Sequence, residues 1–212
     1  MVKEVTAVQK EMVTDENMDW KAQADTLEQI LMQSSTVSEA IKRAKTLRLD
    51  EYYIGAGCVT QIVWNHLSGN PLEYGIKDID FVYYDRNLEA AAENRVIARV
   101  RECFSGLAIP VDTKNEARVH LWYESHFGYA IAAYESLEAA IATWPTTATA
   151  VGVREKAAGG LEIYAPFGLN DLFSMTVRAN KRQITKEIYE RKVRDWLQKW
   201  PGLHVIPWDE TY

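Results

Sequence analysis

The stretch from Leu47 to Asp85, LRLDEYYIGAGCVTQIVWNHLSGNPLEYGIKDIDFVYYD, decides how the chain is expected to fold. Its residues Tyr53 to Cys58 (YIGAGC) are typical of a strand that runs into a glycine turn. The residues that follow, up to Leu67, carry apolar side chains at helical spacing and predict a buried helix. Glycines before a helix let a ligand approach the backbone, and the first N–H groups of the helix can bind a phosphate. The same pattern is also typical of a tight turn that binds nothing.

The segment from Lys77 to Tyr83 (KDIDFVY) predicts a second strand that carries two carboxylates on one face. Side chains alternate along a strand, so Asp78 and Asp80 point to one side while the apolar residues next to them point into a core. Two neighbouring carboxylates repel each other, and a hard cation such as Mg2+, held by carboxylates and substrate phosphates, would relieve that repulsion. Two solvated aspartates at a strand end are the alternative interpretation.

Composition and charge restrict the class of protein. The 212 residues, 47% hydrophobic and 25% charged, predict an ordinary globular protein of one domain or two small ones. A formal net charge of −6 disfavours non-specific binding to nucleic acid.

The cysteines and the hydropathy pattern bear on the compartment. The two cysteines, Cys58 and Cys103, form no metal-binding motif and indicate no disulfide framework, which fits a reducing environment. The N-terminus lacks the apolar core of a signal peptide, and no stretch approaches the roughly 20 apolar residues that span a bilayer. We therefore expect a cytoplasmic protein that is not embedded in a membrane.

The rest of the chain is expected to surround this central unit with helices. We expect residues 1–18 to form a flexible extension, residues 19–130 to form the core, and residues 131–212 to form helices and a hairpin packed on that core. The segment from Asn115 to His126 fits either a strand or a helix, and its capping residue favours the helix. The other expected elements are two helices before Leu47, a helix over Leu88 to Phe104, a strand over Ala108 to Thr113, a helix over Ser136 to Trp144, a hairpin of Thr149 to Arg154 with Leu161 to Ala165, and helices over Leu169 to Val177 and Ile184 to Trp200.

With a glycine turn, an Asp-x-Asp strand and a later acidic strand, the sequence resembles the nucleotidyltransferase superfamily that includes DNA polymerase beta. More closely, it resembles a bacterial family of nucleotidyltransferase-like proteins. The resemblance implies an α+β fold with a small mixed β-sheet core flanked by helices and a helical and hairpin C-terminal part. The matching stretches are Tyr52 to Gly69, Lys77 to Asp85, Val111 to Tyr123, Trp144 to Arg154 and Ala165 to Asn180.

The resemblance also implies a reaction and the residues that perform it. Asp78 and Asp80 would be the metal-binding pair and Asp112 the third carboxylate, in a two-ion site for Mg2+ or Mn2+. A nucleoside monophosphate would move from an NTP to an unidentified acceptor, and pyrophosphate would leave. Glu116 and Asp85 compete with Asp112 for the third position.

The expected nucleotide site departs from the superfamily pattern at the turn. The usual serine or second glycine is replaced by Ala56-Gly57-Cys58, which removes a hydroxyl that could contact a phosphate. A catalytically silent nucleotide-binding or regulatory module is therefore the alternative to an enzyme. A nucleic-acid acceptor is disfavoured by the acidic composition, and the oligomeric state is left open. The expected nucleotide-binding residues are Gly55, Ala56, Gly57, Cys58, Lys114, Asn115 and Arg118.

Overall fold

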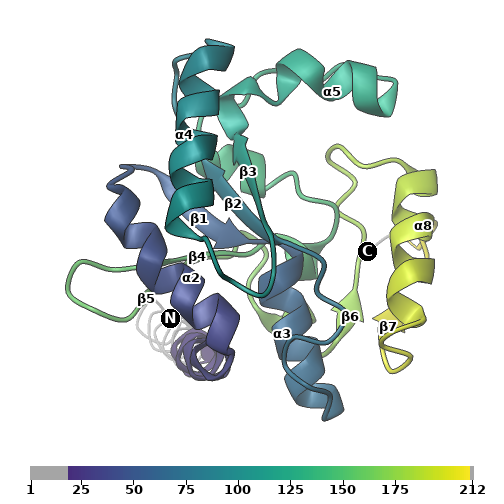
Figure 1. The fold of residues 1–212 in the computed structure, drawn as a ribbon. Helices are drawn as coiled ribbons and strands as arrows, with labels where there is room; N and C mark the ends of the chain where they lie inside the picture. Colours follow the sequence, from purple (N-terminus) through teal and green to yellow (C-terminus); the bar gives the residue numbers. More distant parts are fainter. Residues whose placement is uncertain (1–18, 211–212) are drawn as a thin grey trace, which may run out of the picture.

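A single five-stranded mixed sheet forms the centre of the computed structural model, which describes residues 19–210 (Figure 1). The strand order is β3-β2-β1-β4-β5. The predicted α+β class with a small mixed sheet is confirmed, whereas the predicted extension over residues 1–18 lies outside the described residues. The strands are β1 (Tyr52–Gly55), β2 (Ile79–Tyr83), β3 (Val111–Asn115), β4 (Gly152–Glu155) and β5 (Leu161–Tyr164).

The register of these strands places four residues in one row across the sheet. β1 pairs antiparallel with β2, so that Gly55 lies opposite Asp80. β2 pairs parallel with β3, which sets Asp80 opposite Asp112, and β4 pairs antiparallel with β1, which sets Gly152 opposite Gly55. Paired residues share a face of the sheet, so two glycines and two aspartates follow one another along the same side. We call these four residues the Gly–Asp row.

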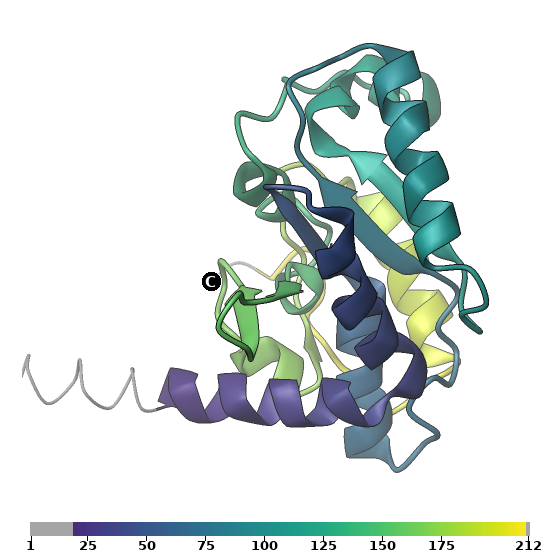
Figure 2. The ribbon, with the colours of Figure 1, turned by 60° about the vertical axis from the view of Figure 1, so that its left-hand side comes forward.

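The two faces of the sheet are covered unequally. The larger core lies on the face of Ile79 and Phe81, which are fully buried as predicted. Side chains of a helix over residues 19–33, of α2 (Ser35–Ala44), α3 (Gly57–Ser68) and α4 (Ala90–Cys103) pack into that core (Figure 2). A smaller cluster on the opposite face joins Tyr53 and Val82 to α6 (Leu137–Ile141). The aspartates of the row therefore point away from the main core, towards the less covered face.

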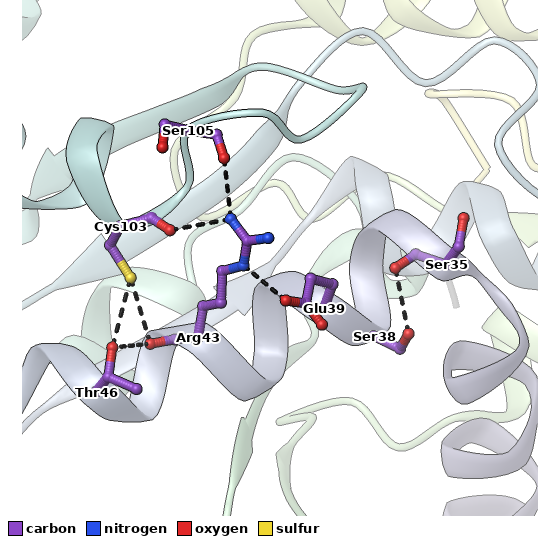
Figure 3. A network of polar contacts seen from close by, with 7 residues as sticks. All are labelled: Ser35, Ser38, Glu39, Arg43, Thr46, Cys103 and Ser105. Carbon is purple, nitrogen blue, oxygen red and sulfur yellow. Dashed lines mark hydrogen bonds and ion pairs between the residues drawn. The ribbon is translucent and has the colours of Figure 1, made fainter.

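Arg43 on α2 fixes this helix to the end of α4 (Figure 3). Its Nη1 donates to the backbone carbonyls of Cys103, at 3.2 Å, and Ser105, at 2.9 Å. Its Nε donates to Glu39 Oε1 at 2.7 Å, which orients the guanidinium along the helix. The contact stabilises the crossover that leads from α4 into β3, because it satisfies carbonyl groups that the end of α4 leaves unpaired.

The segment after β3 resolves into the helical alternative. Asn115 caps a short 3₁₀ helix, η2 (Glu116–Arg118), by accepting a hydrogen bond from Ala117 N, and α5 (His120–Phe127) follows. The predicted helix is confirmed, and the capping asparagine that favoured it is present.

The C-terminal part of the chain contributes a hairpin to the central sheet, and it also forms a helix and a separate pair of short strands. The predicted hairpin is present as β4 and β5, and it extends the central sheet through pairing with β1. After α8 (Lys186–Leu197), the short strand β7 (His204–Val205) pairs with β6 (Thr176–Val177). The remaining elements are the 3₁₀ helices η1 (Lys45–Leu47) and η3 (Thr147–Thr149) and the helix α7 (Asn170–Phe173).

One predicted helix, over Leu169 to Val177, is wrong in its second half. The chain leaves the helical conformation after Phe173, Met175 takes a positive φ of 53°, and the last two residues form β6. The tertiary pairing with β7 outweighs the local helical pattern. Among residues 19–210, no helix is long and apolar enough to cross a membrane.

Gly55 is required by a close approach of backbone to backbone. A Cβ atom at this position would lie 2.5 Å from the carbonyl oxygen of Val151 and 2.9 Å from the ring of Trp144. The same carbonyl accepts a hydrogen bond from Ala56 N at 3.0 Å. The segment before β4 therefore lies directly on the turn that ends β1.

We expect Gly55→Ala to lower the free energy of unfolding by roughly 1–3 kcal/mol or more, because the added methyl group cannot be accommodated without moving backbone. Gly57→Ala is the matched control. There a Cβ would meet only the flexible end of Gln61, at 3.0 Å, and alanine is the better helix former by up to about 1 kcal/mol. Urea denaturation of both variants checks the difference, and equal stability would contradict the proposed close packing at Gly55.

Candidate functional site

The turn between β1 and α3 is built on a strained alanine. Ala56 has φ 55° and ψ −129°, a conformation that glycine adopts readily and other residues rarely do. This accounts for the second glycine that superfamily members usually carry at this turn. Ala56 provides no side-chain cap for α3, so the first N–H groups of the helix are available to an anion.

Cys58 supports this turn from inside the protein. Its side chain is 1% exposed, and its thiol donates a hydrogen bond to the Gly55 carbonyl oxygen at 3.1 Å. Burial raises the pKa of the Cys58 thiol far above its usual range. Any contact of Cys58 with a phosphate must therefore come from its backbone N–H.

A first cavity of about 230 Å³ lies between this turn and α8. Asp78, which precedes β2, and Asp80, within β2, both line it together with Ala56 to Cys58. Its charged lining also includes Lys77, Lys192, Asp195 and Lys199. Lysine side chains and helix N–H groups facing two carboxylates form a site suited to a polyphosphate with bound cations.

Lys114 joins the two aspartates of the Gly–Asp row. Its ammonium forms ion pairs with Asp112 and, at 3.4 Å, with Asp80 Oδ1. Burial raises the pKa of Asp80, although the charge of Lys114 opposes the increase. Burial alone would lower the pKa of Lys114, but the two aspartates outweigh it and the pKa is raised. The ammonium group of Lys114 is thus held between Asp80 and Asp112, the two aspartates of the row.

The carboxylate oxygens of the Gly–Asp row are of the type that binds divalent cations. Carboxylate oxygens are the ligands that Mg2+ prefers, and the bound ammonium shows that positive charge is stabilised between the two strands. Among the described residues, no group of three or more His, Cys, Asp or Glu side chains is already arranged around one point. Binding of a metal ion by Asp112 together with Asp80 would therefore require Lys114 to move.

A second cavity, of about 430 Å³, adjoins the first. The two share Ala56, Asp80, Pro145 and Lys192 as a common wall. Burial lowers the pKa of Lys192, although Asp80 and Asp78 oppose this shift. The ring-bearing side chains of the second cavity are Trp122, Tyr123, His126, Phe127, Tyr134 and Trp144.

Glu116 lines the second cavity and is buried there without a hydrogen-bond partner. The residue is 5% exposed, and burial and the charges of Lys114, Asp80 and Asp112, but no hydrogen bond, act on its carboxyl group among the described residues. Burial raises the pKa of Glu116 from 4.5 to about 7, while Lys114 acts in the opposite direction. Asp80 and Asp112 add to the increase, which means that Glu116 feels the negative charge of the row.

Asn115 and Arg118, two of the expected nucleotide-binding residues, do not line the two cavities. Asn115 Nδ2 donates to the Asp85 carbonyl oxygen at 2.8 Å, and its Oδ1 accepts from Asp85 N at 3.0 Å. Arg118 Nε binds Glu93 Oε2 at 2.6 Å and so ties η2 to α4. Neither residue lines either cavity, because the fold uses both to fix the end of β3.

The three candidates for the third carboxylate have separate places. Asp112 lies in the row beside Asp80, whereas Glu116 lies in the second cavity. Asp85 accepts a hydrogen bond from Asn87 N at 2.9 Å and forms a local turn. The structure thus places Asp112 next to Asp80 but outside both cavities, and it gives Glu116 a different environment.

Comparisons with known proteins agree with this geometry. A family model described as nucleotidyltransferase matches residues 42–205. The chain belongs to this nucleotidyltransferase family. The match covers β1, β2, β3 and both cavities, so the Asp-x-Asp strand and the glycine turn belong to the shared unit. No sequence among curated proteins matches the chain.

The chain is similar to solved structures to different degrees. An NMR structure described as a CCA-adding enzyme head domain is similar with a TM-score of 0.70 and 23% identity, over 85% of this chain and 94% of that one. A tRNA-processing enzyme in an apo form is similar with a TM-score of 0.46 and 17% identity, over 79% of this chain and 42% of that one. The first of these supports the nucleotidyltransferase fold for this family member.

The buried carboxyl of Glu116 should make stability depend on pH. Its raised pKa means that ionisation costs the folded state free energy above pH 7, and that the cost fades as the pH falls towards 4.5. We expect Glu116→Gln to increase the free energy of unfolding by roughly 3 kcal/mol at pH 8 and by less than about 1 kcal/mol at pH 5.

Denaturant unfolding at the two pH values measures this effect. Glu124→Gln, the same change at an exposed position on α5, is the control and should alter stability little at either pH. A Glu116→Gln variant whose stability relative to the wild type is the same at pH 5 and pH 8 would show that the carboxyl is not buried as described.

Proposed function

We propose that this nucleotidyltransferase family member is a Mg2+-dependent enzyme that moves a nucleoside monophosphate from an NTP to an acceptor. The observation that carries the proposal is the Gly–Asp row, in which Asp80 and Asp112 lie in register on parallel strands and hold a cationic group between them. Asp78 lines the same cavity as Asp80, beside the open N-terminus of α3. We further propose that the enzyme works in a cytoplasm.

The aspartates of the Gly–Asp row and the residues of the first cavity have distinct roles in this proposal. Asp78, Asp80 and Asp112 would hold the metal ions, which supply charge neutralisation on the phosphates and activation of the acceptor hydroxyl. The first N–H groups of α3 bind the phosphate chain, and Lys77 and Lys192 offset its charge.

A specific observation favours the alternative, a nucleotide-binding module that performs no transfer. Lys114 already neutralises Asp80 and Asp112, so an ammonium could replace a metal ion permanently. Such a module would bind NTP in the first cavity and release no pyrophosphate. The enzyme and the silent module therefore differ in whether product forms and in whether Mg2+ binds at the aspartates of the row.

Loss of either carboxylate next to the first cavity should abolish transfer. We expect Asp78→Ala and Asp80→Ala each to reduce transfer from an α-phosphate-labelled NTP below detection, because the donors for the metal ion are removed. The assay offers Mg2+ or Mn2+ and a panel of small molecules, proteins and RNA as acceptors, and it measures labelled product and pyrophosphate.

Asp85→Ala is the matched control for that assay. This aspartate lies outside the row, where it forms a local turn, and its loss should leave transfer largely intact. Full activity of the Asp78 or Asp80 variant would rule out the proposed mechanism. Tight NTP binding by the wild type without any pyrophosphate release would favour the silent module.

Removal of the Lys114 charge should expose the row to metal ions. In Lys114→Met, Asp80 and Asp112 lose their shared cation and repel each other, so stability should depend on an added divalent ion. We expect Mg2+ to raise the melting temperature of this variant more than that of the wild type. Lys42→Met, on the exposed surface of α2, should respond as the wild type does. An equal Mg2+ response in all three proteins would show that no ion binds between these aspartates.

A further inference from the structure

The arrangement of the two cavities indicates the side from which the acceptor approaches in the reaction proposed above. In phosphoryl transfer the attacking and leaving oxygens lie roughly in line on opposite sides of the phosphorus. A phosphate chain bound at the N-terminus of α3 places its leaving pyrophosphate in the first cavity. The acceptor must then approach from the other side of Asp80, and the second cavity adjoins Asp80 on the side of β3 and α5.

The second cavity differs from the first in its chemistry. Three cationic side chains line each cavity, but the second cavity also has a larger set of aromatic and aliphatic side chains, whereas the first has the helix N–H groups. Trp122 and Tyr123 come from α5, Trp144 follows α6, and Ile188 comes from α8. Such surfaces bind flat, apolar ring systems through stacking and dispersion.

Glu116 contributes a carboxyl group to this cavity, whose charged lining also includes Asp80, Lys114, Arg191 and Lys192. The residue is 5% exposed and lines the cavity, and no hydrogen bond acts on its carboxyl among the described residues, so its hydrogen-bonding capacity is available to a ligand. An unpaired buried carboxyl lowers stability, and packing alone therefore does not account for a glutamate here. A ligand that donates a hydrogen bond to it would remove that cost.

We propose that the second cavity is the acceptor site and that it takes a small molecule with an aromatic ring and an ammonium or hydroxyl donor, which Glu116 binds. This inference rests on the proposed nucleotidyl transfer. Glu116 acts as a specificity residue, and the rings of α5 and Trp144 hold the body of the acceptor.

The size and charge of the protein favour this class of acceptor over a nucleic-acid end. A cavity of about 430 Å³ falls within the range of small-molecule sites. A polynucleotide would in addition require an extended basic surface, and the chain has a net charge of −6. Binding of an RNA end in the second cavity would therefore overturn the inference.

Calorimetry with tyramine, a phenol ring that carries an ammonium group, tests the site. We expect saturable binding to the full-length wild-type protein, weakened roughly tenfold or more in Glu116→Gln because a charge-assisted hydrogen bond is lost. Glu124→Gln on α5 should bind tyramine as the wild type does. Asp78→Ala should also retain binding, since Asp78 lines only the first cavity of the two.

An NTP analogue with a methylene bridge between the α- and β-phosphates separates the acceptor site from a base-binding site. With Mg2+ present, the analogue should bind the same protein molecule together with tyramine. Displacement of tyramine by the analogue would mean that the cavity holds the nucleobase of the donor, and displacement by a short RNA would mean a polymeric acceptor. Either result, or tyramine binding that is absent or unaffected by Glu116→Gln, overturns the inference. Failure of the analogue to bind, with Glu116-dependent tyramine binding retained, contradicts the proposed function instead.

Discussion

The register that sets Asp80 between Gly55 and Asp112 is the constraint on which the site depends. A slip of one residue in either pairing would turn the aspartates of β2 into the main core and Ile79 and Phe81 out of it. The fully apolar face of β2 thus specifies the register, and the acidic face follows from it. The parallel pairing with β3 further requires a crossover, which α4 provides and which Arg43 on α2 helps to fix.

The two glycines and the two aspartates of the Gly–Asp row have different physical roles. At Gly55 the absence of a side chain lets Trp144 and the carbonyl of Val151 lie against the sheet, and at Gly152 it leaves room for Tyr53 and Ile141. At Asp80 and Asp112 the row carries negative charge, and Asp80 lines both cavities. The protein offsets that charge with Lys114 from β3 and Lys192 from α8, two cations that come from opposite walls. A site held together in this way already stabilises positive charge before any ion or substrate is bound.

Local sequence patterns were sufficient to predict the fold of the site but not its environment. The glycine turn, the helix after it and the alternation around Asp80 depend on neighbouring residues, and they are confirmed. The bridging position of Lys114 depends on which strands pair, and the burial of Glu116 depends on α5 and α8 packing around it. Asn115 and Arg118 follow Asp112 closely in sequence, yet the chain turns after β3 and directs them to Asp85 and Glu93. Sequence proximity to Asp112 therefore did not bring these two side chains into either cavity.

The walls of the cavities, more than the sheet, must decide what the enzyme acts on. The similarity to a CCA-adding enzyme head domain, at 23% identity, concerns the fold that carries the row. The aromatic rings and Glu116 come from α5 and from the connections around it, and α8 completes both cavities. Tyr189 anchors α8 through hydrogen-bond contacts with the carbonyl oxygens of Val177, at 2.9 Å, and Ile206, at 2.7 Å. Because these elements are fixed by contacts outside the row, the proposed acceptor preference could change through their side chains while the proposed chemistry at Asp80 stays the same.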